Sequence, residues 1–452
     1  MEDFAVRNKD YALYLPSIQH QSALAIISGG TELSPNPLPA GLTADDFNWL
    51  DSNNRFWHYH ATLASAARFK DISPLNAVTH RSASTILLGD SGGYQIGTGA
   101  LGETKDWKGK KYTAQKIIDA WKASNIKHEL LSWLDANATL AMSIDMPLWA
   151  LKNEKSPFSN LSKQELLDLS ADNLRFMDAE RNREFGCRIL NVLQAHGDLK
   201  IREDGGKSSE ASEEECYQTV KAFPFEGWAL AGEVGSDGGL YRILRRILLL
   251  RDEGFLDAPR SWIHILKLSP CRWSPILTQI QRAVRKDVNE QFRLSYDSST
   301  PYNIAGVRSQ HVSLPAFGDK LSAWRLPKHK FPTGITAATK HRNKRLNSKP
   351  NKHLLAPLNS PIAQLFTIGD LLKDGRMVRA RAGRLAQEVL INHNVYTYTL
   401  AGIMANEIAF GKNTIVPKEL RTVLDLVPAL FVEENWQDLL RRNRGLLEKI
   451  KR

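Results

Sequence analysis

Short apolar runs alternate with stretches of helical periodicity, and this alternation constrains the fold more than any other feature. Strand-like runs occupy residues 23–28, 85–89, 139–144, 188–193, 227–230, 262–268 and 291–296, with a weaker run at 56–62. Helical periodicity is clear at 163–185, 240–251 and 275–286. Strands that alternate with helices indicate a parallel sheet with crossover helices. About eight strands predict an α/β fold closed as a (β/α)8 TIM-type barrel, with a doubly wound sheet as the alternative.

Composition excludes several classes of protein. The chain has 452 residues, of which 42% are hydrophobic and 24% charged, as in globular proteins and unlike disordered chains. Cys187, Cys216 and Cys271 lie far apart in the sequence, so they form neither a disulfide framework nor a sequence-local zinc motif. The chain shows no signal-peptide pattern and no membrane-spanning apolar stretch. These features predict a cytoplasmic protein without a membrane partner.

Polar residues follow the predicted strands where a barrel would build its active site. Three strands are followed by an acidic residue, one by an amide and one by a glycine: Asp90, Asp145, Asp297, Gln194 and Gly232. In a barrel these strand ends converge on one face. Each aspartate alone is equally consistent with a cap on the next helix. Their occurrence at successive strand ends favours one shared site.

The segments around these positions resemble motifs of the tRNA-guanine transglycosylases. DSGGYQ at 90–95 is similar to the DSGG[FY]Q signature of that family. Later segments resemble its other motifs in the same order: SID at 143–145, NVLQAHGDLK at 191–200, GWALAGEVGSDGG at 227–239, YDSSTP at 296–301 and HNVYTY at 393–398. The resemblance covers most of residues 85–410. It implies a barrel enzyme that exchanges guanine for another base within a nucleic acid.

The resemblance implies that Asp297 is the nucleophile, which attacks C1′ of the sugar and forms a covalent sugar–enzyme intermediate. The reaction also needs a proton donor for the departing base, and Asp90 is the expected general acid and base. Because C1′ is inaccessible within stacked DNA, the target base has to be extruded or single-stranded.

The remaining site residues are expected to bind the base. Asp145 would accept hydrogen bonds from N1–H and the exocyclic amine, whereas Gln194 and the N–H of Gly232 would read the carbonyl side of the ring. Ser91 would assist at the same edge. Tyr94 would supply an aromatic face for stacking.

Departures from the family pattern point to the DNA-directed branch of the superfamily. The tRNA enzymes carry a CxCxxC…H zinc site after the nucleophile, whereas here that interval has no cysteine and only His393 of the expected ligands. We therefore expect no structural zinc and no other cofactor. The glycine pair of the base pocket reads Ala231-Gly232.

This pattern resembles the 7-deazaguanine DNA transglycosylases. The resemblance implies that the partners are DNA and a free 7-deazaguanine base. The expected base is 7-cyano-7-deazaguanine (preQ0), which replaces guanine in DNA modification and restriction systems. The need for a partner protein of the same system stays open, as does the oligomeric state.

A basic segment occupies the place of the zinc subdomain. Between Asp319 and Asp370 there is no acidic residue, and ten Lys and Arg residues there supply nearly the whole net charge of +11. We expect nucleic-acid contacts from four of them, Lys340, Arg342, Lys344 and Arg345, with a solvated loop as the alternative. The predicted organisation is a barrel core at 1–318, the basic insertion at 319–370 and a helical C-terminal part with a basic tail at 371–452.

Three functions remain open at the level of sequence: base exchange in DNA, the same reaction on tRNA, and a non-catalytic nucleic-acid-binding subunit derived from such an enzyme. The retained carboxylates disfavour the non-catalytic subunit. The absent zinc motif and the basic segment favour DNA. His264 lies within the predicted strand at 262–268 and Cys271 lies near a strand end, and both are interpreted as structural residues.

Overall fold

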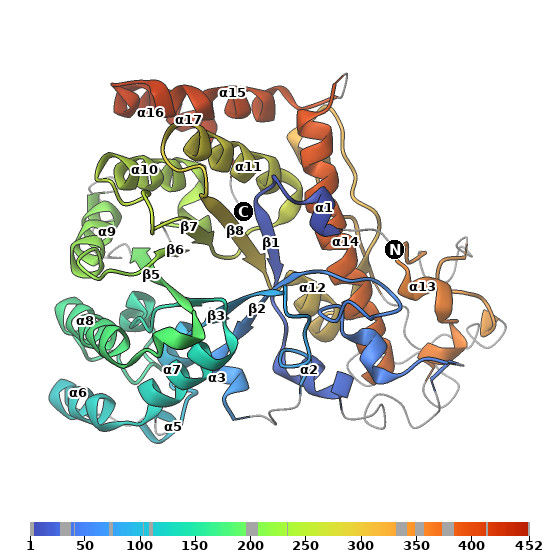
Figure 1. Cartoon of the computed structure of the whole chain (residues 1–452), viewed down its shortest axis with the longest axis horizontal. Coiled ribbons are helices and arrows are strands. Elements are labelled where there is room, and N and C mark those ends of the chain that lie inside the picture. The colour runs from blue at the N-terminus through green and yellow to red at the C-terminus, as the bar shows by residue number, and fades with distance from the viewer. Residues whose placement is uncertain are drawn as a thin grey trace.

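Eight parallel strands form the centre of the protein (Figure 1), with the order β1-β8-β7-β6-β5-β4-β3-β2. The computed structural model describes residues 4–27, 38–39, 41–71, 76–102, 104–107, 112–195, 207–232, 234–330, 341–348, 357–372, 384–412 and 415–450. The strands are β1 Leu13–Pro16, β2 Ala61–Ser65, β3 Ile86–Asp90, β4 Leu140–Met142, β5 Arg188–Ala195, β6 Gly227–Gly232, β7 Trp262–Ile265 and β8 Arg293–Ser298. A separate antiparallel pair consists of β9 Gln310–Val312 and β10 Lys328–Lys330.

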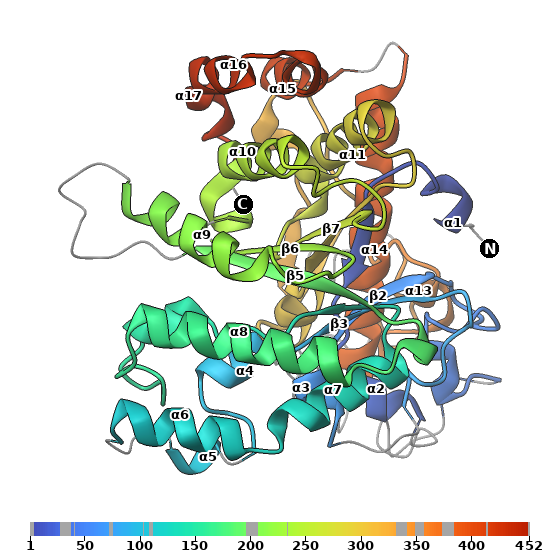
Figure 2. The ribbon, with the colours of Figure 1, turned by 60° about the vertical axis from the view of Figure 1, so that its left-hand side comes forward.

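Helices surround this sheet (Figure 2). Before β5 they are α1 Phe4–Arg7, α2 His20–Ile27, α3 Ala66–Phe69, α4 Gly93–Gly97, α5 Thr104–Trp107, α6 Ala114–Ala123, α7 Ile126–Asn137 and α8 Lys163–Glu180. After β5 they are α9 Lys207–Val220, α10 Gly239–Asp252, α11 Pro270–Asp287, α12 Thr300–Tyr302, α13 Ile362–Leu365, α14 Arg384–Phe410, α15 Lys418–Val432, α16 Trp436–Arg442 and α17 Arg444–Leu447. None of the helices in the described part of the chain is long and apolar enough to cross a membrane.

The sheet is nearly closed between its two edge strands. Just after β1, the N–H of Ile18 donates to the carbonyl of Leu63 in β2 at 2.8 Å. The hydroxyl of Thr62 donates to the carbonyl of Pro16, also at 2.8 Å. Alternate strand residues face the barrel interior and fill it with buried aliphatic side chains, among them Leu13, Leu15, Leu63, Leu88, Leu140, Met142, Leu190 and Val192. The predicted (β/α)8 TIM-type barrel is confirmed.

The predicted strands from 85 onward match β3 to β8, whereas the N-terminal predictions were less accurate. Residues 23–27 of the run at 23–28 lie in α2, so their assignment to a strand was wrong, and residue 28 lies outside the described residues. A short apolar run fits a buried helix as well as a buried strand, and periodicity alone does not separate them. The weaker run at 56–62 overlaps only the start of β2, and the four-residue β1 was missed.

The C-terminal helices pack on the barrel. After β8 the chain makes a long excursion before α14, which packs against α11 and β1, and α15 covers α11 (Figure 1). Within the excursion, residues 341–348 pair with residues 365–369: Leu346 N–H donates to Phe366 O at 3.0 Å. The Phe366 ring packs on Phe47 and Phe56. The excursion is thereby anchored to the segment between β1 and β2.

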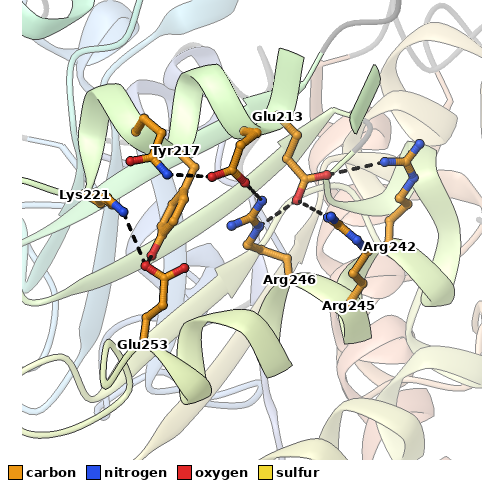
Figure 3. Close-up of polar contacts among 9 residues, drawn as sticks. Glu213, Tyr217, Lys221, Arg242, Arg245, Arg246 and Glu253 are labelled. Carbon is orange, nitrogen blue, oxygen red and sulfur yellow. Dashed lines mark hydrogen bonds and ion pairs between the residues drawn. The ribbon is translucent and has the colours of Figure 1, made fainter. Parts of the chain in front are cut away.

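A buried ionic cluster joins α9 to α10 (Figure 3). The Arg246 guanidinium, which is fully buried, donates from Nε to Glu213 Oε1 at 2.6 Å. Arg242 and Arg245 each approach the Glu213 carboxylate to 3.5 Å. The Arg246 guanidinium also lies over the Tyr217 ring, 4.5 Å from its centroid. This cluster fixes α9, the helix that follows β5, against α10.

Arg246→Met should lower the free energy of unfolding by about 3 kcal/mol, because it leaves the buried Glu213 carboxylate without its closest partner. The value is at the lower end of the usual range, since Arg242 and Arg245 still face Glu213. Arg175→Met is the control: its ion pair with Asp172 is largely exposed, and its loss should change stability by less than about 1 kcal/mol. Urea denaturation measures both variants, and equal small losses would contradict a stabilising role for the cluster.

Candidate functional site

Three carboxylates converge at the C-terminal end of the barrel. Asp90 is the last residue of β3, Asp297 is the penultimate residue of β8, and Asp145 follows the end of β4 by three residues. Their charges interact: burial raises the pKa of Asp90, and the charge of Asp297 raises it further. Burial and the charge of Asp90 raise the pKa of Asp145 to about 7. The structure thus brings together the three acidic residues that the sequence singled out.

In the turn after β3, the backbone passes very close to neighbouring side chains. Gly92 has φ +92°, and a Cβ there would lie 2.2 Å from the Cβ of Ala67. Its N–H donates to Asp90 Oδ1 at 3.0 Å. A Cβ at Gly93 would lie 3.3 Å from Asp145 Oδ1. Gly92 therefore has to be a glycine, whereas a side chain at Gly93 would crowd Asp145.

Asp297 is buried and held by the backbone after β7. The N–H of Lys267 donates to Asp297 Oδ1 at 2.8 Å, and the N–H of Leu268 donates to the Asp297 carbonyl at 2.8 Å. Lys267 adopts φ +67°, a left-handed conformation that is uncommon for a residue with a side chain. This strained residue aims its N–H at the carboxylate, and such strain is typical of functional sites.

His264 also faces Asp297, which the sequence analysis did not anticipate. Its Nε2 lies 3.5 Å from Asp297 Oδ1. Ser295 Oγ lies 2.9 Å from His264 Nδ1 and accepts a hydrogen bond from Trp262 Nε1 at 2.8 Å. The Ser295 hydroxyl hydrogen is then available to Nδ1, so the imidazole hydrogen is assigned to Nε2, on the side of Asp297.

The interpretation of His264 as merely structural therefore misses its position. In the β7–β8 register His264 pairs with Ser295, which lies two residues before Asp297 and so faces the same side of the sheet. The sequence of β7 alone does not indicate this pairing. It becomes visible only in the register between β7 and β8.

Gln194 holds Asp145 in place. Its Nε2 donates to Asp145 Oδ2 at 2.8 Å and to the Met146 carbonyl at 2.9 Å. Its Oε1 accepts from the N–H of Leu148 at 2.9 Å. Both amide hydrogens are therefore used within the protein. Reading the carbonyl side of a base would require one of them, so these contacts make Gln194 a positioning residue for Asp145.

The other expected base-binding residues lie around the same end of the barrel. Ser91 is buried, and its hydroxyl donates to the Ser143 carbonyl at 2.9 Å, which joins the ends of β3 and β4. Gly232 ends β6 with φ +56°. Tyr94 is 66% exposed and stacks on Trp149 with ring centroids 5.8 Å apart. Its ring therefore forms part of the outer surface beside Asp90.

The basic insertion is only partly described. Lys340 lies outside the described residues, whereas Arg342, Lys344 and Arg345 are exposed. Arg345 donates to the carbonyl of Leu365, and the Lys344 carbonyl accepts from Ile368 N–H at 2.9 Å. These side chains project from the paired segments 341–348 and 365–369. Their contact with phosphates stays a prediction.

His393 is a structural residue in α14. Its Nε2 donates to the Val312 carbonyl at 2.7 Å, and its Nδ1 lies 2.7 Å from Ser360 Oγ. Burial lowers the pKa of His393 to about 4. Both ring nitrogens are thus occupied by protein partners. In the described part of the chain, no group of three or more His, Cys, Asp or Glu side chains could hold a metal ion. The absence of zinc stays a prediction.

No protein-family model and no curated protein matches the chain. The geometry of the site itself therefore indicates which chemistry its residues can carry out. Asp297 is held by a backbone N–H, and Asp90 beside it has a raised pKa. Two carboxylates in different environments can divide the tasks of nucleophile and proton donor between them.

Replacement of Asp145 by asparagine should change how stability depends on pH. The pKa of Asp145 is about 7 in the folded protein, against 3.8 for an unperturbed aspartate. The contribution of protonated Asp145 to the free energy of unfolding is therefore fully present below about pH 4 and is lost as the pH rises to about 7. Relative to Asp145→Asn, the wild type should lose a few kcal/mol of unfolding free energy over this window.

The matched control is Asp168→Asn, because Asp168 also accepts a hydrogen bond from a glutamine, Gln164, but is exposed. Urea denaturation at several pH values between 4 and 8 measures the effect. A constant difference between wild type and Asp145→Asn across this range would refute the assigned ionisation of Asp145.

Proposed function

We propose that the chain is a base-exchange transglycosylase, a pentosyltransferase that replaces guanine in DNA with a 7-deazaguanine, preQ0 being the expected base. The observation that carries the proposal is the juxtaposition of Asp90 and Asp297 at one end of a nearly closed barrel. Base exchange needs two carboxylates with different tasks, because one attacks carbon while the other carries a proton. The resemblance of the DSGGYQ and YDSSTP segments supports the same reaction.

The first displacement removes guanine. An Asp297 oxygen attacks C1′ of the deoxyribose, and the bond from C1′ to the base nitrogen N9 breaks. Protonated Asp90 gives its proton to the departing base, so guanine leaves neutral and Asp90 becomes a carboxylate. The raised pKa of Asp90 favours the protonated form that this step requires.

The second displacement reverses the roles. Asp90 accepts the N9–H proton of the incoming 7-deazaguanine while N9 attacks C1′, and the ester bond to Asp297 breaks. Two displacements give net retention at C1′ and leave the phosphodiester chain intact. Asp90 ends protonated and Asp297 ionised, as at the start, so the reaction needs no oxidant, reductant or cofactor.

Asp145 is the proposed reader of the base edge. Guanine and its 7-deaza analogues share the N1–H and the exocyclic amine, and an ionised Asp145 accepts from both. Gln194 holds one Asp145 oxygen at 2.8 Å, which fixes the orientation of the carboxylate. The exposed Tyr94 ring is available for stacking with an extruded base.

Labelled preQ0 offered with single-stranded DNA, duplex DNA and tRNA in parallel tests the function. We expect incorporation into DNA, with single-stranded DNA the better substrate because its bases need no extrusion. Asp297→Asn should reduce incorporation by about 10³-fold or more, because it removes the nucleophile. Binding of the free base should be nearly unchanged. Asp425→Asn, on the exposed face of α15, is the control and should keep full activity.

Two alternatives make different predictions in the same experiment. A tRNA-guanine transglycosylase would label tRNA in preference to DNA. A non-catalytic subunit would label no polymer but would still bind nucleic acid. Full incorporation by Asp297→Asn would remove Asp297 from the mechanism and contradict the proposal.

A further inference from the structure

A polar groove of about 570 Å³ opens beside the strand end that carries Asp297. It lies between α2, α3, α12 and the start of α14, and Figure 1 shows α2, α12 and that part of α14 close together. Most of its lining side chains carry hydrogen-bond donors, including Gln19, Gln21, Arg68, Tyr302, Asn303 and Arg384.

The groove belongs to the same barrel face as the carboxylates. Its walls come from the segments that directly follow β1, β2 and β8. In the β1–β8 register Pro16 pairs with Ser298, the neighbour of Asp297, and α12 begins at Thr300. On the other wall, Arg68 lies three residues after Ser65, which pairs with Asp90 in the β2–β3 register. The groove lining therefore follows, within a few residues, the end of β8, which carries Asp297, and the end of β2, which pairs with Asp90.

Arg68 carries the free positive charge of the groove. It is exposed, and no acidic side chain among the described residues pairs with it. Arg384 differs, since its guanidinium donates to the Gln21 carbonyl and lies 3.5 Å from Glu388. Glu388 also accepts from the Ser22 hydroxyl at 3.1 Å. An anion in the groove would therefore find its main charge partner in Arg68.

Tyr302 supplies an unused donor. Its side chain is only 3% exposed, and within the described residues its hydroxyl has no hydrogen-bond partner. Burial and the charge of Glu388 raise the pKa of Tyr302 well above its ordinary value, so the hydroxyl stays protonated. A bound acceptor would supply the hydrogen bond that this buried hydroxyl lacks. The next residues, Asn303–Val307, form a π-helical turn, a feature frequent at functional sites.

We propose that this groove binds the phosphodiester backbone of the DNA strand beside the target nucleotide, an inference that rests on the proposed function of the site. Phosphate oxygens only accept hydrogen bonds, so they suit a lining of guanidinium, amide and hydroxyl donors. A strand held here would run toward Asp297, because Tyr302 in the groove lining follows the end of β8 by four residues. Backbone contacts position the strand without reading its sequence.

The test measures DNA binding apart from catalysis. A fluorescent single-stranded oligodeoxynucleotide is titrated at several salt concentrations against Asp297→Asn, which does not turn over. Adding Arg68→Gln should weaken binding several-fold at low salt and reduce the slope of log K against log salt by about 0.7. Adding Arg421→Gln, an exposed arginine on α15, is the control and should change neither. An unchanged slope with Arg68→Gln would overturn the inference.

Tyr302→Phe gives a second readout, because it keeps the ring and removes only the donor. It should weaken DNA binding several-fold without changing the salt slope, and it should leave binding of the free base unchanged. A purely structural Tyr302 would give no loss of DNA affinity. Inorganic phosphate at matched ionic strength is the last control. If it displaces DNA from the protein with Arg68 intact but not from Arg68→Gln, the groove binds small anions, and this result would contradict a strand-binding groove.

Exchange kinetics in the chain that retains Asp297 separate the two proposals. If DNA is labelled, Arg68→Gln should raise KM for DNA and leave kcat nearly unchanged. Labelled DNA with an unchanged KM would refute the groove and leave the proposed function standing. If no polymer is labelled but Arg68→Gln still weakens oligonucleotide binding, the proposed function fails while the groove is supported as a backbone-binding site.

Discussion

Closure of the parallel sheet is the constraint on which the rest of the structure depends. The contacts of Ile18 and Thr62 across the β1–β2 edge bring the first strand beside both β2 and β8. Because all eight strands run in the same direction, closure forces their C-terminal ends into one ring. Residues as distant in sequence as Asp90 and Asp297 then share a small, largely buried volume. In an open sheet the two strands would lie far apart.

Three carboxylates in one buried volume repel one another, and the protein limits this repulsion by giving each a different environment. Asp297 receives an N–H from Lys267 at 2.8 Å and faces the His264 ring. Asp90 and Asp145 have raised pKa values, so protonation relieves part of the charge. Under the proposed function, these different environments suit the separate tasks of nucleophile and proton donor. The pKa differences that reduce the repulsion among the three carboxylates thus also suit the reaction that we propose.

The sequence predicts the barrel and the set of acidic residues, because each depends on local pattern. Strands such as β5 and β8 are recognisable from apolar runs that end in a polar residue. What the sequence could not predict are features that depend on pairing between segments. His264 is recognisable only from the β7–β8 register, and the internal hydrogen bonds of Gln194 only from the packing of β5 beside the segment after β4. The groove needs four segments in place at once, so no local pattern could have indicated it.

Covalent attachment of the sugar to Asp297 is the central claim, and mass spectrometry tests it most directly. The wild type would be mixed with guanine-containing single-stranded DNA without an incoming base, denatured rapidly and digested with nuclease and trypsin. Trypsin is expected to release residues 294–308, in which Asp297 is the only acidic side chain. The account predicts a deoxyribose-derived adduct on this peptide. An adduct on the peptide that contains Asp90, or active exchange without any adduct, would contradict it.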